Sequence, residues 1–522
     1  MNSKYLINTA VREYPDNIAV ICPDVRLTYR QLDERVNRLA NALIGRGLRK
    51  GDRVGILMKN GHEYIETDFA LSKTGLVRVA LNYRLGIKDH AYVINDSDSN
   101  ALIFSQDFAG DVAAMRDHLP SVEKYICVEN KNGGQLDEDI LHYEEMLAAS
   151  APDDPGIEIN EEDLHQLTYT SGTTGNPKGV MISEKAWSST TINILLNYGP
   201  ITEKDVILNL QQLSHGAGYF VMPFFIRGAT NVLIDFEPSR VFETVQNEGV
   251  TMIKLVPVML YKLLDAYPLQ TYDLSSLKQI IYGGSPISRP RLVQALDVFG
   301  EKLSQLYGQA EVPMCLTTLS REDHRIEGTE EEIKRLESAG KPCTNVEIKI
   351  VDDDGKELGF GEKGEVAARG EHIMTGYWKM PEATAETLKD GWVYTGDMGY
   401  MDSKGFVFLV DRKKDVIISG GFNIFPAEVE KIIITHPNVQ EASVIGVPDD
   451  NWGEAVKAFV VLKPGTAATA EEIISFCKEG GLGFRAPKSI DFIDEIPRNP
   501  YGKVDKNRLR EPYWEGLGKQ IN

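Results

Sequence analysis

The sequence predicts a multidomain protein of mixed α/β and α+β class. We expect a large N-terminal domain of layered α/β sheets with a β-rich subdomain, and a small mobile α+β C-terminal domain. The chain has 522 residues, well beyond the ~250–300 residues at which one hydrophobic core stops growing. Helix and strand signals alternate through its first half, as expected of sheets covered by helices. From about Asn345 the pattern becomes β-type, and a separate α+β pattern follows it.

The first part of the chain carries helix and strand signals in turn. Residues 28–47, TYRQLDERVNRLANALIGRG, place leucine, valine and alanine at helical spacing and end at glycine, which predicts a helix. Residues 51–58, GDRVGILM, predict a buried strand, and residues 101–106 and 124–130 continue the alternation. Residues 149–163 are acidic and rich in proline and glycine, which predicts a surface connection.

A second group of α/β signals follows this connection. The segments expected to hold strands and helices around a second core are 205–211, 230–236, 251–264 and 277–284. Residues 327–338 are rich in charge and predict a solvated helix. Residues 345–358, NVEIKIVDDDGKEL, alternate in polarity and contain an Asp-Gly turn, which predicts a hairpin.

The C-terminal segment has its own order of elements. The expected order is helix 426–436, strand 439–447, strand 455–462, helix 470–479 and strand 489–493. A short charged stretch, DRKKD, precedes it. We therefore expect residues 1–411 and 412–522 to form separate domains.

Composition excludes several classes of function. The formal net charge of −21 argues against a broad nucleic-acid surface, which needs accumulated lysine and arginine. The five cysteines form no CxxC pair or metal-ligand spacing, which favours a reducing compartment over a disulfide framework or a zinc site. The N-terminus lacks a signal pattern, and the longest apolar window, residues 216–226, is too short to cross a bilayer. We expect a cytoplasmic protein without a transmembrane segment.

One loop carries an unusual concentration of glycine and hydroxyl residues, LTYTSGTTGNPKGV at residues 167–180. Its glycines permit close backbone approach, its hydroxyls donate hydrogen bonds, and its lysine adds a positive charge, which together suit a triphosphate. It is not a Walker A loop, because Gly-Lys-Ser/Thr opening a helix is missing. A mobile surface turn is the alternative interpretation. The candidate phosphate-binding residues are Thr170, Ser171, Gly172, Thr173, Thr174, Gly175 and Lys178.

This loop resembles the signature phosphate loop of the adenylate-forming superfamily, which includes acyl- and aryl-CoA synthetases, carrier-loading adenylation domains and luciferases. The resemblance covers essentially the whole chain and is strongest to AMP-forming fatty or aromatic acyl-CoA ligases. It implies ATP as a substrate, Mg²⁺ as the cofactor, and a small C-terminal domain that swings about a hinge. It also assigns ATP and carboxylate binding to residues 1–411 and a catalytic lysine to residues 412–522.

The segment QLYGQAE, residues 305–311, is by itself an apolar turn that ends in a carboxylate. The resemblance implies that Glu311 binds the Mg²⁺ on the nucleotide and that Tyr307 stacks on adenine, with Gly308 and Gln309 in the same ATP site. Mg²⁺ prefers one or two carboxylates together with phosphate oxygens and water, in agreement with this role. The family often has threonine where this chain has Ala310.

Two further turns gain nucleotide roles only from the resemblance. In YGGSPIS, the backbone at Gly284 and Ser285 is expected to pass the adenine ring and the acyl pocket. In WVYTGD, Asp397 is expected to bind the ribose hydroxyls. Taken singly, each would be an ordinary turn.

The start and end of the C-terminal domain carry the remaining motifs. The resemblance implies that Arg412 contacts ribose and phosphate, that Lys414 is the hinge, and that Gly420 and Gly421 line the pantetheine passage of CoA. In PRNPYGKVDK, Lys503 is expected to bridge the substrate carboxylate and the α-phosphate. A lysine near a C-terminus is otherwise mostly exposed to solvent.

The segment LSHGAGYF contains His215, which the resemblance makes a gate between the acyl pocket and the pantetheine tunnel. Relatives often have an aromatic residue before it, where this chain has Ser214. A histidine in a polar turn is the alternative. The expected catalytic residues are thus His215, Glu311, Arg412 and Lys503.

The leading hypothesis is an AMP-forming carboxylate–CoA ligase that acts on a fatty or aromatic acid, because the apolar run at residues 216–226 favours such acids over acetate. The alternatives are an enzyme that passes the acyl group to a carrier protein or oxidises it, and a non-catalytic nucleotide-binding relative. Retention of the lysine, glutamate, aspartate and arginine residues named above argues against the last. The expected partners are a carboxylic acid, ATP and CoA, with a homodimer as the default assembly.

Overall fold

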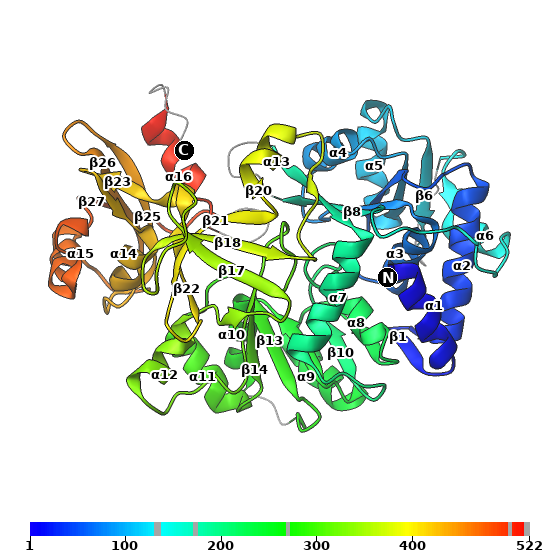
Figure 1. Ribbon diagram of the computed structural model, residues 1–522, viewed down its shortest axis with the longest axis horizontal. Coiled ribbons are helices and arrows are strands. Elements are labelled where there is room, and N and C mark those ends of the chain that lie inside the picture. Colours follow the sequence, from blue (N-terminus) through cyan, green and yellow to red (C-terminus); the bar gives the residue numbers. More distant parts are fainter. Residues whose placement is uncertain (130–136, 171–175, 268–271, 499–503, 516–522) are drawn as a thin grey trace. The chain divides into compact units, whose positions relative to one another are not determined.

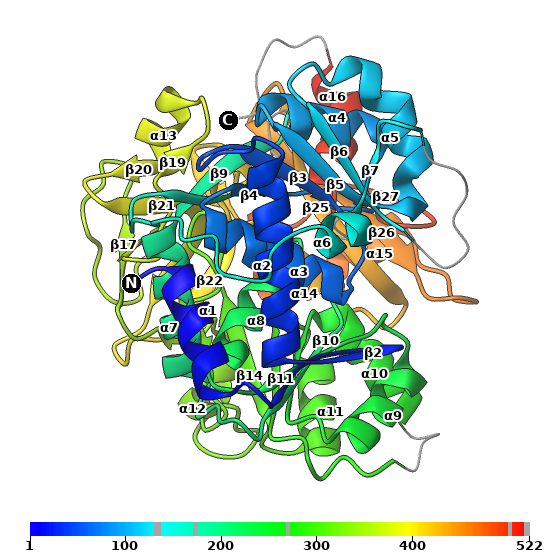
Figure 2. The same cartoon turned by 90° about the vertical axis from the view of Figure 1, so that its right-hand side faces the viewer.

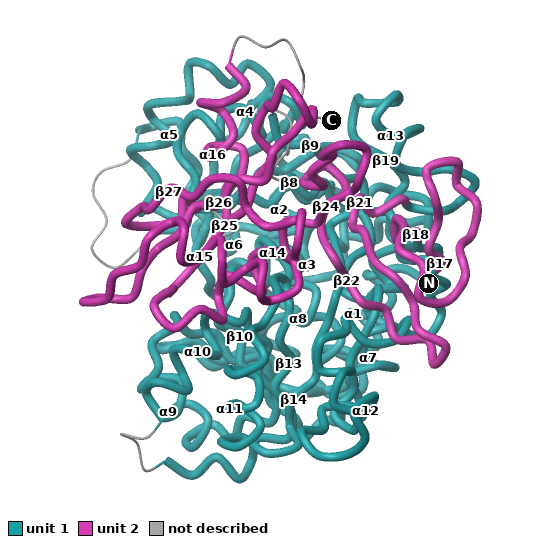
Figure 3. Tube along the Cα trace, turned by 90° about the vertical axis from the view of Figure 1, so that its left-hand side faces the viewer, with its two compact units in different colours: residues 1–348, 368–393 teal, residues 349–367, 394–522 magenta. Residues whose placement is uncertain are grey.

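The computed structural model describes residues 1–129, 137–170, 176–267, 272–498 and 504–515. The chain divides into two compact units, coloured separately in Figure 3. Unit 1 comprises Met1–Ile348 and Ala368–Val393, and unit 2 comprises Lys349–Ala367 and Tyr394–Asn522. Unit 2 therefore takes in two segments that precede the division placed by the sequence between residues 411 and 412.

The first sheet of unit 1 has eight strands in the order β19-β9-β8-β4-β3-β5-β6-β7. Its strands from β8 to β7 run parallel, and the hairpin partner β9 and the edge strand β19 run antiparallel to their neighbours. The strands are β3 Arg53–Leu57, β4 Val77–Ala80, β5 Ala101–Ser105, β6 Lys124–Val128, β7 Leu141–His142, β8 Leu164–Thr170, β9 Lys178–Ser183 and β19 Gly376–Tyr377.

Helices cover both faces of this sheet. Helices α2 (Tyr29–Gly45), α3 (His62–Thr74) and α6 (Tyr143–Ala148) pack on one face, and α4 (Ile87–Asp96) and α5 (Ala109–Met115) pack on the other. Thr28 and Gln31 form a capping box at the start of α2, and the leucines that follow at helical spacing are buried. Figure 2 shows α2 lying beside α1 (Ser3–Glu13) and α3.

The second sheet of unit 1 has nine strands in the order β16-β15-β14-β13-β12-β10-β11-β1-β2. Its six central strands, from β14 to β1, are parallel. The strands are β1 Ile18–Cys22, β2 Val25–Thr28, β10 Val206–Asn209, β11 Thr230–Leu233, β12 Met252–Leu255, β13 Gln279–Gly283, β14 Leu303–Tyr307, β15 Thr317–Leu319 and β16 Lys341–Pro342.

This second sheet is also covered on both faces, so unit 1 is built of alternating helical and sheet layers. Helices α7 (Glu184–Tyr198) and α8 (Gly218–Phe225) pack on one face, and α9 (Pro238–Glu248), α10 (Pro257–Ala266) and α11 (Arg289–Phe299) pack on the other. Figure 1 shows α9, α10 and α11 in green beside β10, β13 and β14. Proline opens α9, α10 and α11 within the first helical turn, where its missing N–H leaves no bond unmade.

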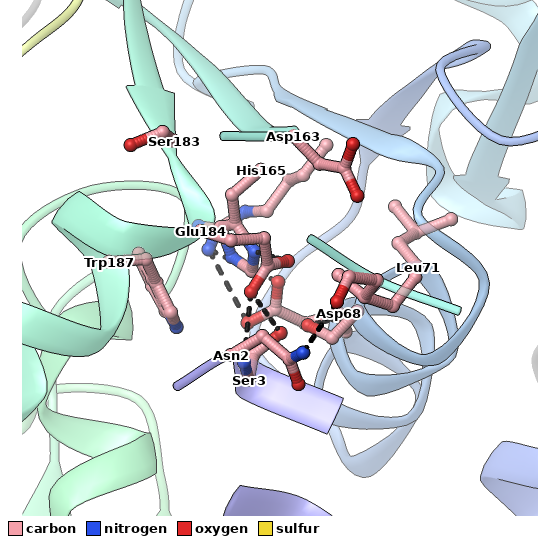
Figure 4. A network of polar contacts seen from close by, with 12 residues as sticks. Asn2, Ser3, Asp68, Leu71, Asp163, His165, Ser183, Glu184 and Trp187 are labelled. Atoms are coloured by element: carbon pink, nitrogen blue, oxygen red, sulfur yellow. Dashed lines mark hydrogen bonds and ion pairs between the residues drawn. The ribbon is translucent and has the colours of Figure 1, made fainter. Parts of the chain in front are cut away.

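The N-terminal helix is anchored to unit 1 by a buried carboxylate (Figure 4). Glu184 Oε2 accepts hydrogen bonds from the backbone N–H and the hydroxyl of Ser3, at 2.9 and 2.7 Å. Its Oε1 lies 2.8 Å from Nδ1 of His165, whose ring stacks on Trp187. Burial disfavours the charged form of Glu184 and so would raise its pKa. The contacts with His165 and Ser3 outweigh burial and hold the pKa of Glu184 below its usual range.

A smaller five-stranded sheet has the order β17-β18-β21-β20, with β22 paired to β21. The chain passes between the two units within β17, β18 and β21. Its strands are β17 Val346–Val351, β18 Gly364–Gly370, β20 Leu388–Lys389, β21 Trp392–Met401 and β22 Val407–Arg412. The hairpin predicted for residues 345–358 is observed in short form: Val351 and Glu357 form an antiparallel bridge, and the Leu358 N–H donates to the backbone oxygen of Ile350 at 2.8 Å. The strand Val346–Val351 also pairs with β18.

The C-terminal part of unit 2 is a five-stranded sheet in the order β24-β23-β26-β25, with β27 paired to β26. Helices α14 and α15 bury their apolar faces against it. The elements are β23 Ile417–Ser419, β24 Phe422–Ile424, α14 Pro426–Ile433, β25 Val439–Asp449, β26 Gly453–Leu462, α15 Ala470–Cys477, β27 Ser489–Phe492 and α16 Lys506–Trp514. The two remaining α-helices are α12 Glu330–Lys334 and α13 Pro381–Thr387, both in unit 1.

The structure confirms the predicted fold class and most predicted elements. Residues 28–47 hold α2, residues 51–58 hold β3, and the order expected after residue 426 is observed. The connection at residues 149–163 contains no helix or strand, and most of it is exposed. Within the described ranges, no helix is both long enough and apolar enough to span a membrane.

Candidate active site

The candidate site of unit 1 lies at the carboxyl ends of its parallel strands. Strand β10 pairs with β11 on one side and with β12 on the other, so the chain moves to one side after β10 and to the other after β12. This reversal is a topological switch point, where open α/β sheets bind ligands. The loops that follow β10, β12, β13 and β14 therefore meet at one edge of the sheet.

Several predicted residues occur in these loops. Gly284 and Ser285 follow β13, and Gly284 has φ +87°, a conformation that favours glycine. Tyr307 ends β14, and Gly308 and Gln309 come next in the chain. A Cβ on Gly308 would lie 2.7 Å from the backbone nitrogen of Met314, so the tight turn after β14 requires glycine there.

Lys178 and Glu311 converge on one tyrosine. The Tyr377 hydroxyl donates a hydrogen bond of 2.8 Å to Oε1 of Glu311. Lys178 Nζ lies 4.9 Å from the centroid of the same ring, within the range of a cation–π contact. Burial and the Glu311 carboxylate raise the pKa of Tyr377, so its hydroxyl keeps its proton. Two residues that lie 133 positions apart in the chain are thereby joined.

The predicted phosphate loop closes a hairpin. Strands β8 and β9 pair in antiparallel fashion, and Thr170 lies opposite Lys178 at the end of the ladder. The strands Leu164–Thr170 and Lys178–Ser183 thus flank the predicted phosphate loop. Ser171, Gly172, Thr173, Thr174 and Gly175 lie outside the described residues.

His215 lies in the loop after β10, partly buried, with Nδ1 2.8 Å from Oγ of Ser214. Burial, followed by the positive charges of Arg78 and Lys254, lowers the pKa of His215 to about 4. The imidazole is therefore neutral at pH 7. At pH 7 the His215 imidazole therefore adds no positive charge to the site.

The predicted residues of unit 2 form a second group. Asp397 and Arg412 face each other across β21 and β22, and Arg412 Nε lies 2.7 Å from Oδ1 of Asp397. The Asp397 side chain is 8% exposed and that of Arg412 is 44% exposed. The ion pair therefore joins the nearly buried carboxylate of Asp397 to the solvent-exposed guanidinium of Arg412.

The other predicted residues of unit 2 follow in the chain. Burial lowers the pKa of Lys414 to about 8, although Asp415 opposes this shift. Gly420 and Gly421 are exposed, with φ of +58° and +81°. A Cβ on Gly420 would lie 2.6 Å from the Trp452 ring, so a larger residue would displace that side chain. Lys503 lies outside the described residues.

The structure thus brings Lys178 and Glu311 to the same tyrosine in unit 1 and pairs Asp397 with Arg412 in unit 2. Sequence reasoning missed Tyr377, which no recognisable motif marks, and Lys254, whose pKa burial lowers to about 8. Lys254 did carry a signal, because it is the one charged residue in the otherwise apolar strand MIKL.

Two family models match the chain. The model described as AMP-binding enzyme matches residues 7–378, and the one described as AMP-binding enzyme C-terminal domain matches residues 428–503. A curated relative, a medium/long-chain-fatty-acid–CoA ligase of Mycobacterium tuberculosis, is 35% identical and covers 99% of this chain and 91% of its own length. A feruloyl-CoA synthase of Amycolatopsis sp is 35% identical over 96% of this chain and 97% of its own.

Solved structures agree with the sequence matches. An amide bond synthetase from Marinactinospora thermotolerans superposes with a TM-score of 0.87 at 30% identity, covering 98% of this chain and all of that one. An o-succinylbenzoate CoA synthetase from Bacillus subtilis, in complex with its acyl-adenylate intermediate, gives 0.83 at 30% identity and 97% coverage of both chains. The chain belongs to the AMP-binding, adenylate-forming enzyme family.

Proposed function

We propose that this protein is an AMP-forming carboxylate–CoA ligase, an acid–thiol ligase that activates an acid with an apolar body. The observation that carries the proposal is the convergence of Lys178 and Glu311 on Tyr377 in a chain of this family. It joins the end of the predicted phosphate loop to the predicted metal-binding carboxylate. Relatives are named for fatty, feruloyl and 2-succinylbenzoyl substrates, all of them carboxylic acids joined to CoA.

The chemistry explains why cations must gather at such a site. A carboxylate oxygen of the acid attacks the α-phosphorus of ATP, and the bond to pyrophosphate breaks, which leaves an acyl-adenylate. The thiol of CoA then loses its proton and attacks the acyl carbon, and AMP leaves with the bonding electrons. Because two anions meet in the first step, positive groups that are already in place stabilise its transition state more than they stabilise the separated reactants.

We assign the roles as follows. Lys178 and the hydroxyl and glycine residues of its loop hold the phosphates, and Tyr307, Gly308, Gln309, Gly284 and Ser285 surround adenine. Asp397, held by Arg412, accepts hydrogen bonds from the ribose hydroxyls. Lys503 bridges the carboxylate and the α-phosphate. His215, neutral at pH 7, lets the pantetheine thiol pass without a competing charge.

Glu311 fits the role of a Mg²⁺ ligand. Within the described residues its carboxylate accepts one hydrogen bond, at Oε1 from Tyr377, which leaves Oε2 to ligate. The described residues contain no cluster of three or more metal-binding side chains, as suits an ion carried in largely by the nucleotide. When bound, Mg²⁺ would neutralise phosphate charge during adenylation.

We also propose that Lys414 is a hinge that separates residues 1–411 from 412–522. The two half-reactions need different groups at one reacting centre, first Lys503 and then the residues around Gly420 and Gly421. A domain swing about one residue would supply each set in turn. The homodimer and the cytoplasmic location expected from the sequence stay predictions.

The test uses the purified full-length protein with ATP, Mg²⁺ and a panel of carboxylic acids. Acid-dependent release of pyrophosphate supports adenylation, and CoA-dependent formation of a thioester selects the ligase over a carrier-protein enzyme. Pyrophosphate release with no thioester would favour acyl transfer to a carrier protein. No pyrophosphate release with any acid would favour a non-catalytic nucleotide-binding protein.

A further inference from the structure

A lysine side chain is buried at the switch point of the nine-stranded sheet. Lys254, the third residue of β12, is 8% exposed and lies between Asn209 of β10 and Ile281 of β13. Its Nζ donates a hydrogen bond of 2.7 Å to Oε1 of Gln211. No described carboxylate forms an ion pair with it, and the residues outside the described ranges contain no aspartate or glutamate. An ammonium group with three donors thus has one neutral partner.

This arrangement is unfavourable for folding alone. A buried charge costs free energy unless a counter-charge compensates it. Along β12, Ile253 and Leu255 join one apolar cluster, and Met252 joins the other. Since side chains alternate on a strand, Lys254 shares the face of Met252, where an apolar residue would pack without this penalty. The retained charge therefore indicates a ligand.

Around Lys254, the positive charges of the described residues outnumber the negative ones. Arg78, buried nearby, lies 3.2 Å from a carboxylate oxygen of Asp68 and donates a hydrogen bond to the backbone oxygen of Leu213. The positive charges of Arg78 and Lys254 both lower the pKa of His215, whose imidazole is therefore neutral at pH 7. Two cations and one carboxylate give a net positive field at the end of β12, which an anion would neutralise.

The ammonium group of Lys254 lies beside the loops that form the candidate active site of unit 1. A Cβ on Gly216, the residue after His215, would lie 3.0 Å from Lys254 Nζ and 3.1 Å from Cε of Met314. Any side chain at position 216 would press on the ammonium, so glycine is what lets the loop pass this close to Lys254. Met314 in turn packs its backbone against Gly308, in the turn after β14. Lys254 therefore borders both the predicted acyl gate and the predicted nucleotide turn.

We propose that Lys254 determines substrate specificity by binding a second carboxylate of the acid, distal to the carboxylate that is adenylated. The inference rests on the proposed function and narrows its substrate to a dicarboxylic acid with an apolar body. One N–H of the Lys254 ammonium donates to Oε1 of Gln211, which leaves two N–H donors for the distal carboxylate. Because Oε1 of Gln211 faces the lysine, the amide nitrogen of Gln211 can supply a further donor. An ammonium–carboxylate pair away from water is among the stronger polar contacts.

The test compares pairs of acids that differ only in the distal carboxylate, such as hexanoate with adipate, octanoate with suberate, and 4-phenylbutanoate with 4-(2-carboxyphenyl)butanoate. Pyrophosphate release gives kcat and KM for each acid with the wild-type protein and with Lys254→Met, which keeps the length and removes the charge. We expect the wild type to prefer a diacid, and Lys254→Met to lower kcat/KM for that diacid by about 10- to 100-fold, mainly through KM. The matched monoacid should change by less than about threefold.

Lys262→Met is the matched control, because Lys262 is an exposed lysine on α10, the next element of the chain. It should alter no acid's kinetics. A structural role for Lys254 predicts a lower melting temperature and an equal loss for both acids of a pair, whereas our proposal predicts a melting temperature at pH 7 that is unchanged or higher. Either an equal loss or a wild-type preference for monoacids overturns the inference. A protein that releases no pyrophosphate with any acid instead overturns the proposed function.

Discussion

Lys254 and Arg78 of unit 1 and Arg412 of unit 2 are cations in contrasting environments. In unit 1, Lys254 and Arg78 are buried, at 8% and 2% exposed, within parallel strands. In unit 2, Arg412 is 44% exposed on the antiparallel strand β22, and Gly420 and Gly421 lie on the surface. Water screens exposed charges, so the charges of Lys254 and Arg78 act strongly where they lie, whereas the charge of Arg412 gains strength when a ligand covers it.

The same difference appears in how the units titrate. In unit 1, burial lowers the pKa values of His215, His324 and His372 to about 4. In unit 2, burial raises the pKa of Asp411 to about 6, although Lys506 opposes the shift. Burial disfavours the charged form in each case, but the histidines are bases and Asp411 is an acid. Lowering the pH therefore acts against unit 1 and, through Asp411, in favour of unit 2.

The largest expected effect tests whether unit 2 supplies the main catalytic cation. Lys503→Ala should reduce adenylate formation by about 100- to 1,000-fold, the usual loss when one group that stabilises a developing charge is removed. Thioester formation from a supplied acyl-adenylate should stay largely intact. Stopped-time assays of pyrophosphate release and of thioester give the two rates separately. Equal losses in a correctly folded variant would show that Lys503 has another role.

The next effect tests the hinge. Lys414→Pro fixes φ at this position and restricts Lys413 before it. We expect the thioester step to slow by about tenfold or more, with adenylation changed much less, because only one orientation of the C-terminal domain stays accessible. Lys413→Ala serves as the control, since it removes the neighbouring ion pairs with Glu365 and Asp353 without restricting the backbone. Similar losses in both half-reactions would argue against a swing.

A smaller effect is expected from the contact that joins Lys178 to Glu311. Tyr377→Phe removes the 2.8 Å hydrogen bond to Glu311 and keeps the ring beneath Lys178. The KM for MgATP should rise by roughly 3- to 10-fold, as expected when one hydrogen bond to a charged group is lost. Tyr272→Phe is the matched control, because its hydroxyl also donates to a carboxylate, Glu243, at an exposed place. An unchanged KM in Tyr377→Phe would separate this cluster from nucleotide binding.

The smallest effect is the difference in acid stability between the units. His215, His324 and His372 of unit 1 have folded pKa values below their unfolded value of about 6.5, so the unfolded state binds more protons between pH 6.5 and 4. Their contribution is complete above pH 6.5 and is lost as the pH falls, by roughly 1–3 kcal/mol per histidine. Hydrogen exchange at pH 7, 5.5 and 4.5 should show unit 1 losing protection first. Earlier loss in unit 2 would contradict the comparison.

Much of the fold could be predicted because it depends on local patterns. The helix at Tyr29–Gly45 follows from its capping residues and apolar spacing, and the strands around residues 53–57 and 101–105 follow from short apolar runs between breakers. The hairpin at residues 345–358 also followed from its local Asp-Gly turn, but the pairing of Val346–Val351 with β18 did not. Strand pairing depends on distant segments, which a local pattern does not contain.

The sequence by itself determined the family, the places of its motifs and the alternation of helices and strands, since these depend on residue order and on short-range propensity. Only the tertiary structure decided that Lys178 and Glu311 both contact Tyr377, that His215 is neutral, and that Lys254 is a buried cation with no carboxylate partner among the described residues. Those properties arise from side chains that lie far apart in the chain and from their removal from water. Burial and long-range proximity exist only once the sheets have formed.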